Sequence, residues 1–223
     1  MAATRQQEAV LVQESVLATN SVLRNTYWLL ALTLLCTAGC AAISSALALP
    51  HPGMILTLVG YFGLLFLTHK FSNSSLGLVF IFLLTGFMGF TLGPILSAVA
   101  SFPNGDQTIM TAFGATGVIF LGVSGYALTT RKRFSFMSGF LVVGILGAFV
   151  LGLIAAIFQL SALSLAVSAA FVLLSSGLIL YQTGEIVNGG ETNYILATIT
   201  LWVSLYNLFM SLLHLLMAFS GED

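Results

Sequence analysis

The sequence predicts an all-α integral membrane protein with seven transmembrane helices. Of its 223 residues, 58% are hydrophobic and only 6% are charged, whereas roughly 25% of the residues in a soluble domain carry a charge. The mean hydropathy is +1.07. Apolar segments that approach the roughly 20 residues needed to cross a bilayer recur along the chain, separated by short polar connections.

The first 25 residues are polar, and we expect residues 1–25 to form a cytosolic N-terminal tail with at most a short helix on the membrane surface. The membrane domain then covers residues 26–219, and residues 220–223 form a short external tail. Within this domain, we expect helices at residues 27–49, 54–68, 76–100, 109–130, 136–158, 162–181 and 194–219. The second segment is short for a span, so its ends must adjust to the bilayer.

Turn-forming residues support these boundaries. Two prolines lie between the first and second segments, a polar run of serine and asparagine follows the second, and a Pro-Asn-Gly turn follows the third. Three consecutive basic residues end the fourth segment, and two glycines lie between the sixth and seventh. These five breaks therefore have residues that favour a turn or resist burial in lipid.

The positive-inside rule predicts the orientation. With seven crossings and a cytoplasmic N-terminus, every basic residue falls on the cytoplasmic side. These residues are Arg5, Arg24, Lys70, Arg131, Lys132 and Arg133. The C-terminus is then outside the cytoplasm.

The third segment contains Gly89, Gly93 and Pro94. Two glycines four residues apart form a notch that allows another helix to approach closely. Pro94 removes a backbone donor and favours a kink. The pattern is typical of a packing notch, and a hinge that opens a path across the bundle is the alternative.

Two polar stripes mark the sixth and seventh segments. Their members recur at intervals of three, four and seven residues, which places each set on one helical face: Ser161, Ser164, Ser168, Ser175 and Gln182, then Thr200, Ser204, Asn207, Ser211 and His214. Because polar side chains in a bilayer turn toward protein or water, the stripes indicate the inside of a bundle. They predict either a hydrogen-bonded seam or a narrow hydrated path.

His214 is the one titratable side chain well inside an apparent span. It either responds to protons or, as a neutral imidazole, bonds a neighbouring helix. The spans contain no Asp and no metal-binding motif, so the sequence offers no catalytic, cofactor or metal site, and we predict that the protein is not an enzyme. A net charge of -1 excludes nucleic-acid binding. Nearly uncharged spans also disfavour a solute transporter.

Several short motifs are more specific than the apolar segments. They are Leu23–Tyr27 (LRNTY), Leu56–Gly60 (LTLVG), Gly93-Pro94, Leu128–Lys132 (LTTRK), Gly189–Tyr194 (GGETNY) and Leu205–Phe209 (LYNLF). In this order they resemble the Bax inhibitor family, from about Arg24 to the C-terminus. The resemblance implies six helices around a central C-terminal helix.

The resemblance also implies two functions. One is modulation of the membrane-anchored AAA protease FtsH in the bacterial inner membrane. The other is a pH-sensitive calcium leak that depends on two aspartates, whose positions correspond to Gln182 and Ser204 here. Calcium is normally held by several oxygens that include carboxylates, and neutral Gln and Ser oxygens lack that charge. Glu185, one turn beyond Gln182, is typical of a solvated helix end. Protease modulation is therefore our leading hypothesis, and a cation path along Gln182, Ser204 and Asn207 is the alternative.

Overall fold

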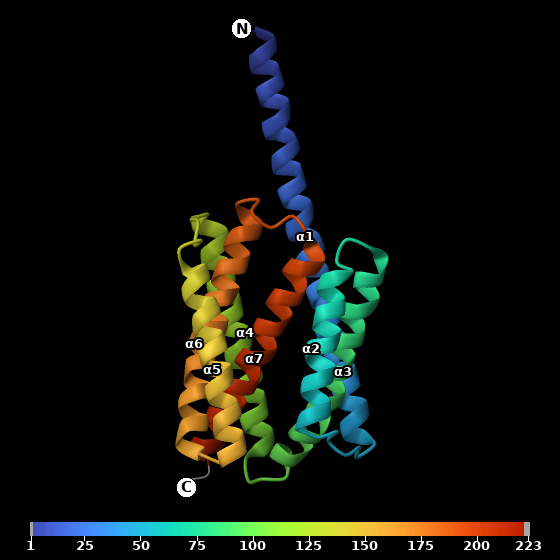
Figure 1. The fold of residues 1–223 in the computed structure, drawn as a ribbon, viewed down its shortest axis with the longest axis vertical. Helices are drawn as coiled ribbons and strands as arrows, with labels where there is room; N and C mark the ends of the chain where they lie inside the picture. Colours follow the sequence, from blue (N-terminus) through green and yellow to red (C-terminus); the bar gives the residue numbers. More distant parts are fainter. Residues whose placement is uncertain (1, 221–223) are drawn as a thin grey trace.

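A computed structural model describes residues 2–220, and the side chains from Thr19 onward. Over these residues the chain is all helical, as predicted, and each expected segment corresponds to a helix (Figure 1). The helices are α1 (Ala2–Ala46), α2 (Met54–Lys70), α3 (Ser75–Ala100), α4 (Gly105–Thr130), α5 (Met137–Phe158), α6 (Ser161–Val187) and α7 (Tyr194–Ser220).

Six of the helices are long and apolar enough to cross a membrane, and α1 qualifies through residues 19–46. Helix α2 is also apolar but has only 17 residues. At 1.5 Å per residue it is about 25 Å long, slightly less than a bilayer core of about 30 Å. The prolines before it and the polar turn after it explain its length.

Helix α1 differs from the tail that the sequence predicts. Its backbone continues without a break from Ala2 into the first apolar segment, and its N-terminal part projects beyond the other helices (Figure 1). No proline or glycine occurs before Gly39 to interrupt it. The polar residues from Ala2 to Asn25 therefore extend the first helix.

Helix α7 is the most deeply buried of the six long helices and packs against α1, α2, α3, α4 and α6. These five contacts agree with the expectation that the C-terminal helix lies at the centre of the bundle. Helix α5 departs from that arrangement, since among the described helices its backbone approaches only α6. One ring pair, between Phe149 and Phe62 of α2, also touches it at 5.5 Å. Because α5 is apolar on all sides, lipid can cover the faces that other helices leave open.

The main apolar core joins α1, α3, α6 and α7. Its fully buried side chains include Ile81, Leu84, Ile179, Ile199 and Leu208. Buried polar side chains within the described part of the chain are Thr, Ser and Gln, and none of them carries a charge. The interior that positions the candidate site is therefore polar in places but electrically neutral.

Candidate functional site

The prediction that both polar stripes face the inside of the bundle holds for some of their residues and not for others. Gln182 is 6% exposed and Ser204 is 1% exposed, so both side chains are inside the bundle. Asn207 and Glu185 are half-buried, and His214 is exposed. The polar character of the stripes therefore continues from the buried interior to the surface, and His214 does not lie in the interior.

Hydrogen bonds show how the stripes are used. Ser168 Oγ lies 2.8 Å from His214 Nδ1 and joins α6 to α7. Ser204 instead donates to the Thr200 carbonyl of its own helix at 2.7 Å, which is common for serine in membrane helices. His214 thus bonds the neighbouring helix α6, but Ser204 does not contribute a bond between α6 and α7.

The side chain of Gln182 is unusual because its Nε2 is buried and has no hydrogen-bond partner among the described residues. Its neighbour Thr183 is fully buried, with Oγ1 at 3.5 Å from Ser124 Oγ of α4. Leaving a buried amide unpaired costs free energy. This position is therefore one of the few where the interior is imperfectly satisfied.

A polar contact that the stripes do not predict connects α7 to α1. Trp202 Nε1 donates to Thr37 Oγ1 at 3.1 Å, and Thr198 Oγ1 donates to the Thr26 carbonyl at 3.2 Å. Trp202 is 1% exposed, and Thr198 is fully buried. Thr198 and Trp202 are four residues apart, so the sequence could have placed them on one face of the helix. The polar pattern misses this face because Trp202 counts as an apolar residue there, and its indole N–H is recognised as polar only when its partner is known.

The glycines of α3 pack against α1. A methyl group on Gly89 would overlap the Thr37 carbonyl oxygen, and one on Gly93 would lie 2.6 Å from the Ala41 carbonyl oxygen. Thr37 Oγ1 also donates to the Thr85 carbonyl at 3.1 Å across the same contact. The close approach of the two backbones thus requires both glycines. Helix α3 runs through Pro94 without interruption, and the hinge remains a prediction.

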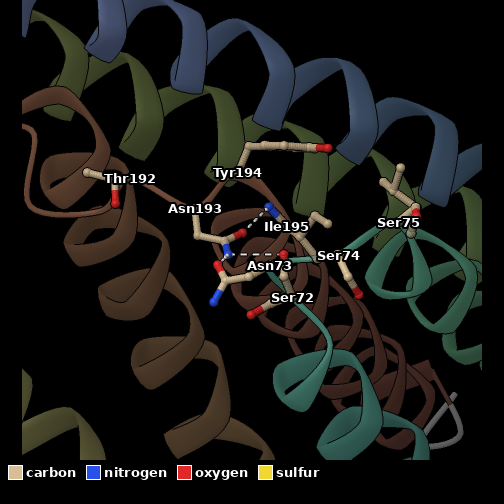
Figure 2. Close-up of a pocket in the computed structure, with 9 residues that line it drawn as sticks. Ser72, Asn73, Ser74, Ser75, Thr192, Asn193, Tyr194 and Ile195 are labelled. Atoms are coloured by element: carbon tan, nitrogen blue, oxygen red, sulfur yellow. Dashed lines mark hydrogen bonds between the residues drawn. The ribbon is translucent and has the colours of Figure 1, made fainter.

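A polar pocket of about 500 Å³ lies where the α2–α3 turn meets the α6–α7 connection. Asn193 joins the two, since its Nδ2 donates to the Ser72 carbonyl at 3.1 Å and to Asn73 Oδ1 at 2.9 Å (Figure 2). Its Oδ1 accepts from the Ile195 N–H at 2.9 Å and so caps α7. The specific Gly189–Tyr194 motif therefore includes a residue that positions two connections and one helix.

Glu185 lies at the same end of the molecule, with its carboxylate against Gly190. Among the described residues, no group of three or more His, Cys, Asp or Glu side chains is close enough to hold a metal ion. The arrangement around Gln182 and Ser204 thus offers neutral oxygens from one amide and one hydroxyl. Both groups can form hydrogen bonds, and neither of them is a carboxylate.

The chain closely resembles known bacterial proteins. A family model described as "Inhibitor of apoptosis-promoting Bax1" matches residues 19–221. The "Modulator of FtsH protease YccA" of Escherichia coli K12 is 52% identical over 210 residues, which cover 94% of each chain. An uncharacterized protein of Pseudomonas aeruginosa is 53% identical over 207 residues, covering 92% of each. An uncharacterized membrane protein of Vibrio cholerae is 43% identical over 211 residues, covering 94% of this chain and 95% of the relative.

The long apolar helices and the neutral interior define a multi-pass helical membrane protein. With the family model matching from the first apolar helix onward, the chain belongs to the Bax inhibitor family. A relative from a second Escherichia coli strain, also 52% identical over 210 residues, is called "Inner membrane protein YccA". The present protein is a multi-pass protein of the bacterial inner membrane.

Proposed function

We propose that the protein binds and modulates the membrane-anchored AAA protease FtsH. The observation that supports this most strongly is the 52% identity to the FtsH modulator of Escherichia coli over 94% of both chains. The matched region covers 94% of this chain and 94% of the relative. The likeness is one of the whole molecule, and it does not depend on a single motif.

We also propose that all seven helices span the membrane, with the N-terminus in the cytoplasm and the C-terminus outside. Figure 1 shows the α2–α3, α4–α5 and α6–α7 connections at the same end as the N-terminus. Lys70, Arg131, Lys132 and Arg133 lie in or beside these connections, and the opposite connections contain no Lys or Arg. The positive-inside rule places the basic end in the cytoplasm.

The projecting part of α1 provides a segment that FtsH can engage. The stretch from residue 2 to Thr19 is about 26 Å long at 1.5 Å per residue, and it points away from the bundle (Figure 1). Helices in proteins owe most of their stability to packing against other elements. A projecting helical end is therefore the part of this chain that is easiest to unwind and to deliver to a cytosolic unfolding ring.

The bundle behind that helix resists extraction. Helix α1 is fixed to α7 through the bond between Thr37 and Trp202, and to α3 through the glycine contacts. A protease that pulls on residues 1–25 must break these contacts before α1 leaves the membrane. Slow dislocation would occupy the enzyme without any catalytic residue in this protein.

The alternative, a calcium leak, lacks a supporting observation. Its two key positions hold Gln182 and Ser204, and Ser204 bonds its own helix. We propose instead that the neutral positions, including Asn207, fill the interface around α7.

Crosslinking in membranes tests the FtsH proposal. We expect the full-length protein to crosslink to FtsH, and deletion of residues 2–17 to lengthen its lifetime in cells. A matched control replaces residues 2–17 with an equally long Gly/Ser segment, which should restore turnover because only an accessible end is required. Absence of an FtsH crosslink, together with an unchanged lifetime after the deletion, would contradict the proposal.

A further inference from the structure

The connection between α4 and α5 presents three consecutive cations. Arg131, Lys132 and Arg133 are all exposed, and Arg131 ends α4 in a left-handed conformation with φ of 51°. Half of the chain's six basic residues are thus concentrated in one short connection. A cluster of this kind attracts anionic groups at a membrane surface.

This connection is fixed to the end of α6. The Lys132 carbonyl accepts a hydrogen bond from Asn188 Nδ2 at 3.2 Å. The ring of Phe134 is 8% exposed and packs where Gly184 leaves room for it. Phe136, two residues later, is 81% exposed. Buried anchors therefore hold the backbone, while the three basic side chains and one aromatic ring face outward.

An apolar groove of about 470 Å³ begins beside this connection and runs between α5 and α6. Small residues from both helices line it, among them Gly144, Gly147 and Ala170. Phe140 and Leu173 line it as well and are 70% and 76% exposed. Several lining residues, among them Val143 and Gly147, are exposed, so the groove is open to the surroundings of the bundle.

The spacing between groove and cations matches a phospholipid. Met137, four residues after Arg133, lines the groove, and so does Gly177 of α6. Gly184, against which Phe134 packs, lies seven residues farther along α6, which is about 10 Å. The headgroup layer on one side of a bilayer is about 5–8 Å thick. An acyl chain in the groove would therefore place its phosphate within reach of the basic side chains.

We propose that this surface, formed by residues 131–133 and the α5–α6 groove, binds one anionic phospholipid. The basic residues contact the phosphate, and an acyl chain fills the groove between the small residues. Charge complementarity favours this occupant over a transmembrane helix, because an apolar helix would leave the three cations without a counter-charge. The proposal does not depend on FtsH modulation.

Native mass spectrometry of the full-length protein in detergent tests it with two probes, dioleoylphosphatidylglycerol and dioleoylphosphatidylcholine, which share their acyl chains. We expect tighter binding of phosphatidylglycerol. Lys132→Gln should weaken its binding about fivefold, the contribution of one cation at a membrane surface. Lys70→Gln removes the same charge at the exposed end of α2 and should change the affinity less than twofold.

Gly147→Leu tests the groove. A Cβ at Gly147 meets no other atom within 4 Å, so a larger side chain can enter the groove without a clash at its first carbon. Because the leucine side chain would then occupy the groove, binding of both lipids should fall at least fivefold. The matched control is Gly122→Leu on the exposed face of α4, where the same space is open. Thermal unfolding verifies that each variant is folded.

Equal affinity for the two lipids, or equal effects of Lys132→Gln and Lys70→Gln, would overturn the proposal. If Gly147→Leu leaves lipid binding unchanged but prevents copurification of a second membrane protein, the groove is a helix-docking surface. That result would overturn it as well.

Discussion

Ser204 and Gln182 occupy the two positions at which the family resemblance implies aspartates, and the structure shows what neutral residues do there. Ser204 satisfies its hydroxyl within α7, whereas Gln182 keeps a buried amide nitrogen without a partner. Trp202, two residues from Ser204, makes the stronger interhelical contact through its indole N–H. At the scale of residues, therefore, packing and neutral hydrogen bonds hold α7 in place.

Substitution of Ser204 tests this neutral interface. Ser204→Ala should change the free energy of unfolding by no more than about 1 kcal/mol, because the hydroxyl bonds only its own helix. Ser204→Asp should lower it by about 3 kcal/mol, since the position is 1% exposed and offers no cation to a carboxylate. Unfolding in detergent by titration with sodium dodecyl sulfate measures both. Equal stability of the two variants would show that water or a cation reaches this position.

Helices α1 and α3 have the most extensive contact of any helix pair among the described residues. Ser44 Oγ donates to the Phe90 carbonyl at 2.9 Å, one turn from the Gly93 contact. The pair illustrates how membrane helices associate when lipid is as apolar as their side chains, because small residues let the backbones approach and hydroxyls bond across the gap. At the scale of elements, α3 supports α1, which in turn contacts the central helix.

Gly89→Ala tests the α1–α3 contact. The new methyl group would overlap the Thr37 carbonyl oxygen, so we expect a loss of about 1–3 kcal/mol in the free energy of unfolding. The control is Gly63→Ala in α2, where a Cβ meets nothing within 4 Å. That change should stabilise the protein by about 0.5–1 kcal/mol, because alanine favours a helix interior. If both variants have the same stability in detergent, the helices do not need the glycine contact.

The whole molecule has two unlike ends. One end gathers the projecting N-terminal helix, the basic connections and the Asn193 junction (Figures 1 and 2). The other end has short connections without Lys or Arg. In the proposed orientation, a partner in the cytoplasm would meet the first end, which is where both the FtsH proposal and the phospholipid proposal place their contacts.

Reporter fusions test the orientation at this scale. Alkaline phosphatase, which is active only outside the cytoplasm, should be active when fused after Asp223 and inactive when fused after Lys132. Green fluorescent protein at the same two positions should give the opposite pattern and controls for expression. A fluorescent fusion after Asp223 together with an active phosphatase fusion after Lys132 would mean either that the whole orientation is inverted or that the 17-residue α2 does not cross the membrane.

Much of the fold could be predicted because its causes are local. The helix bounds follow from apolar runs that end at prolines, glycines or charges, and the predicted segments 76–100 and 194–219 agree with α3 and α7 to within one residue. The start of the first helix at Ala2 could not be predicted, because polar composition does not distinguish a separate tail from a helix that continues out of the bundle.

The site was less predictable because its causes are not local. Periodicity placed Gln182 and Ser204 on inward faces, but it carried no information about their partners, and it placed the exposed His214 on the same stripe. The contact between Trp202 and Thr37 joins residues 165 positions apart. The bond between Asn193 and Ser72 is also long-range, because the two residues are 121 positions apart.

The sequence by itself determined the membrane class, the number of helices and the gathering of basic residues into alternate connections. These features depend on the transfer of each segment between water and lipid, a property of its own composition. Only the tertiary structure decided that α7 bonds α1, that the backbone of α5 approaches α6 and no other described helix, and that the basic connection at Arg131–Arg133 adjoins a groove. Those outcomes depend on which helices can approach closely, and in lipid that is decided by packing between residues distant in the chain.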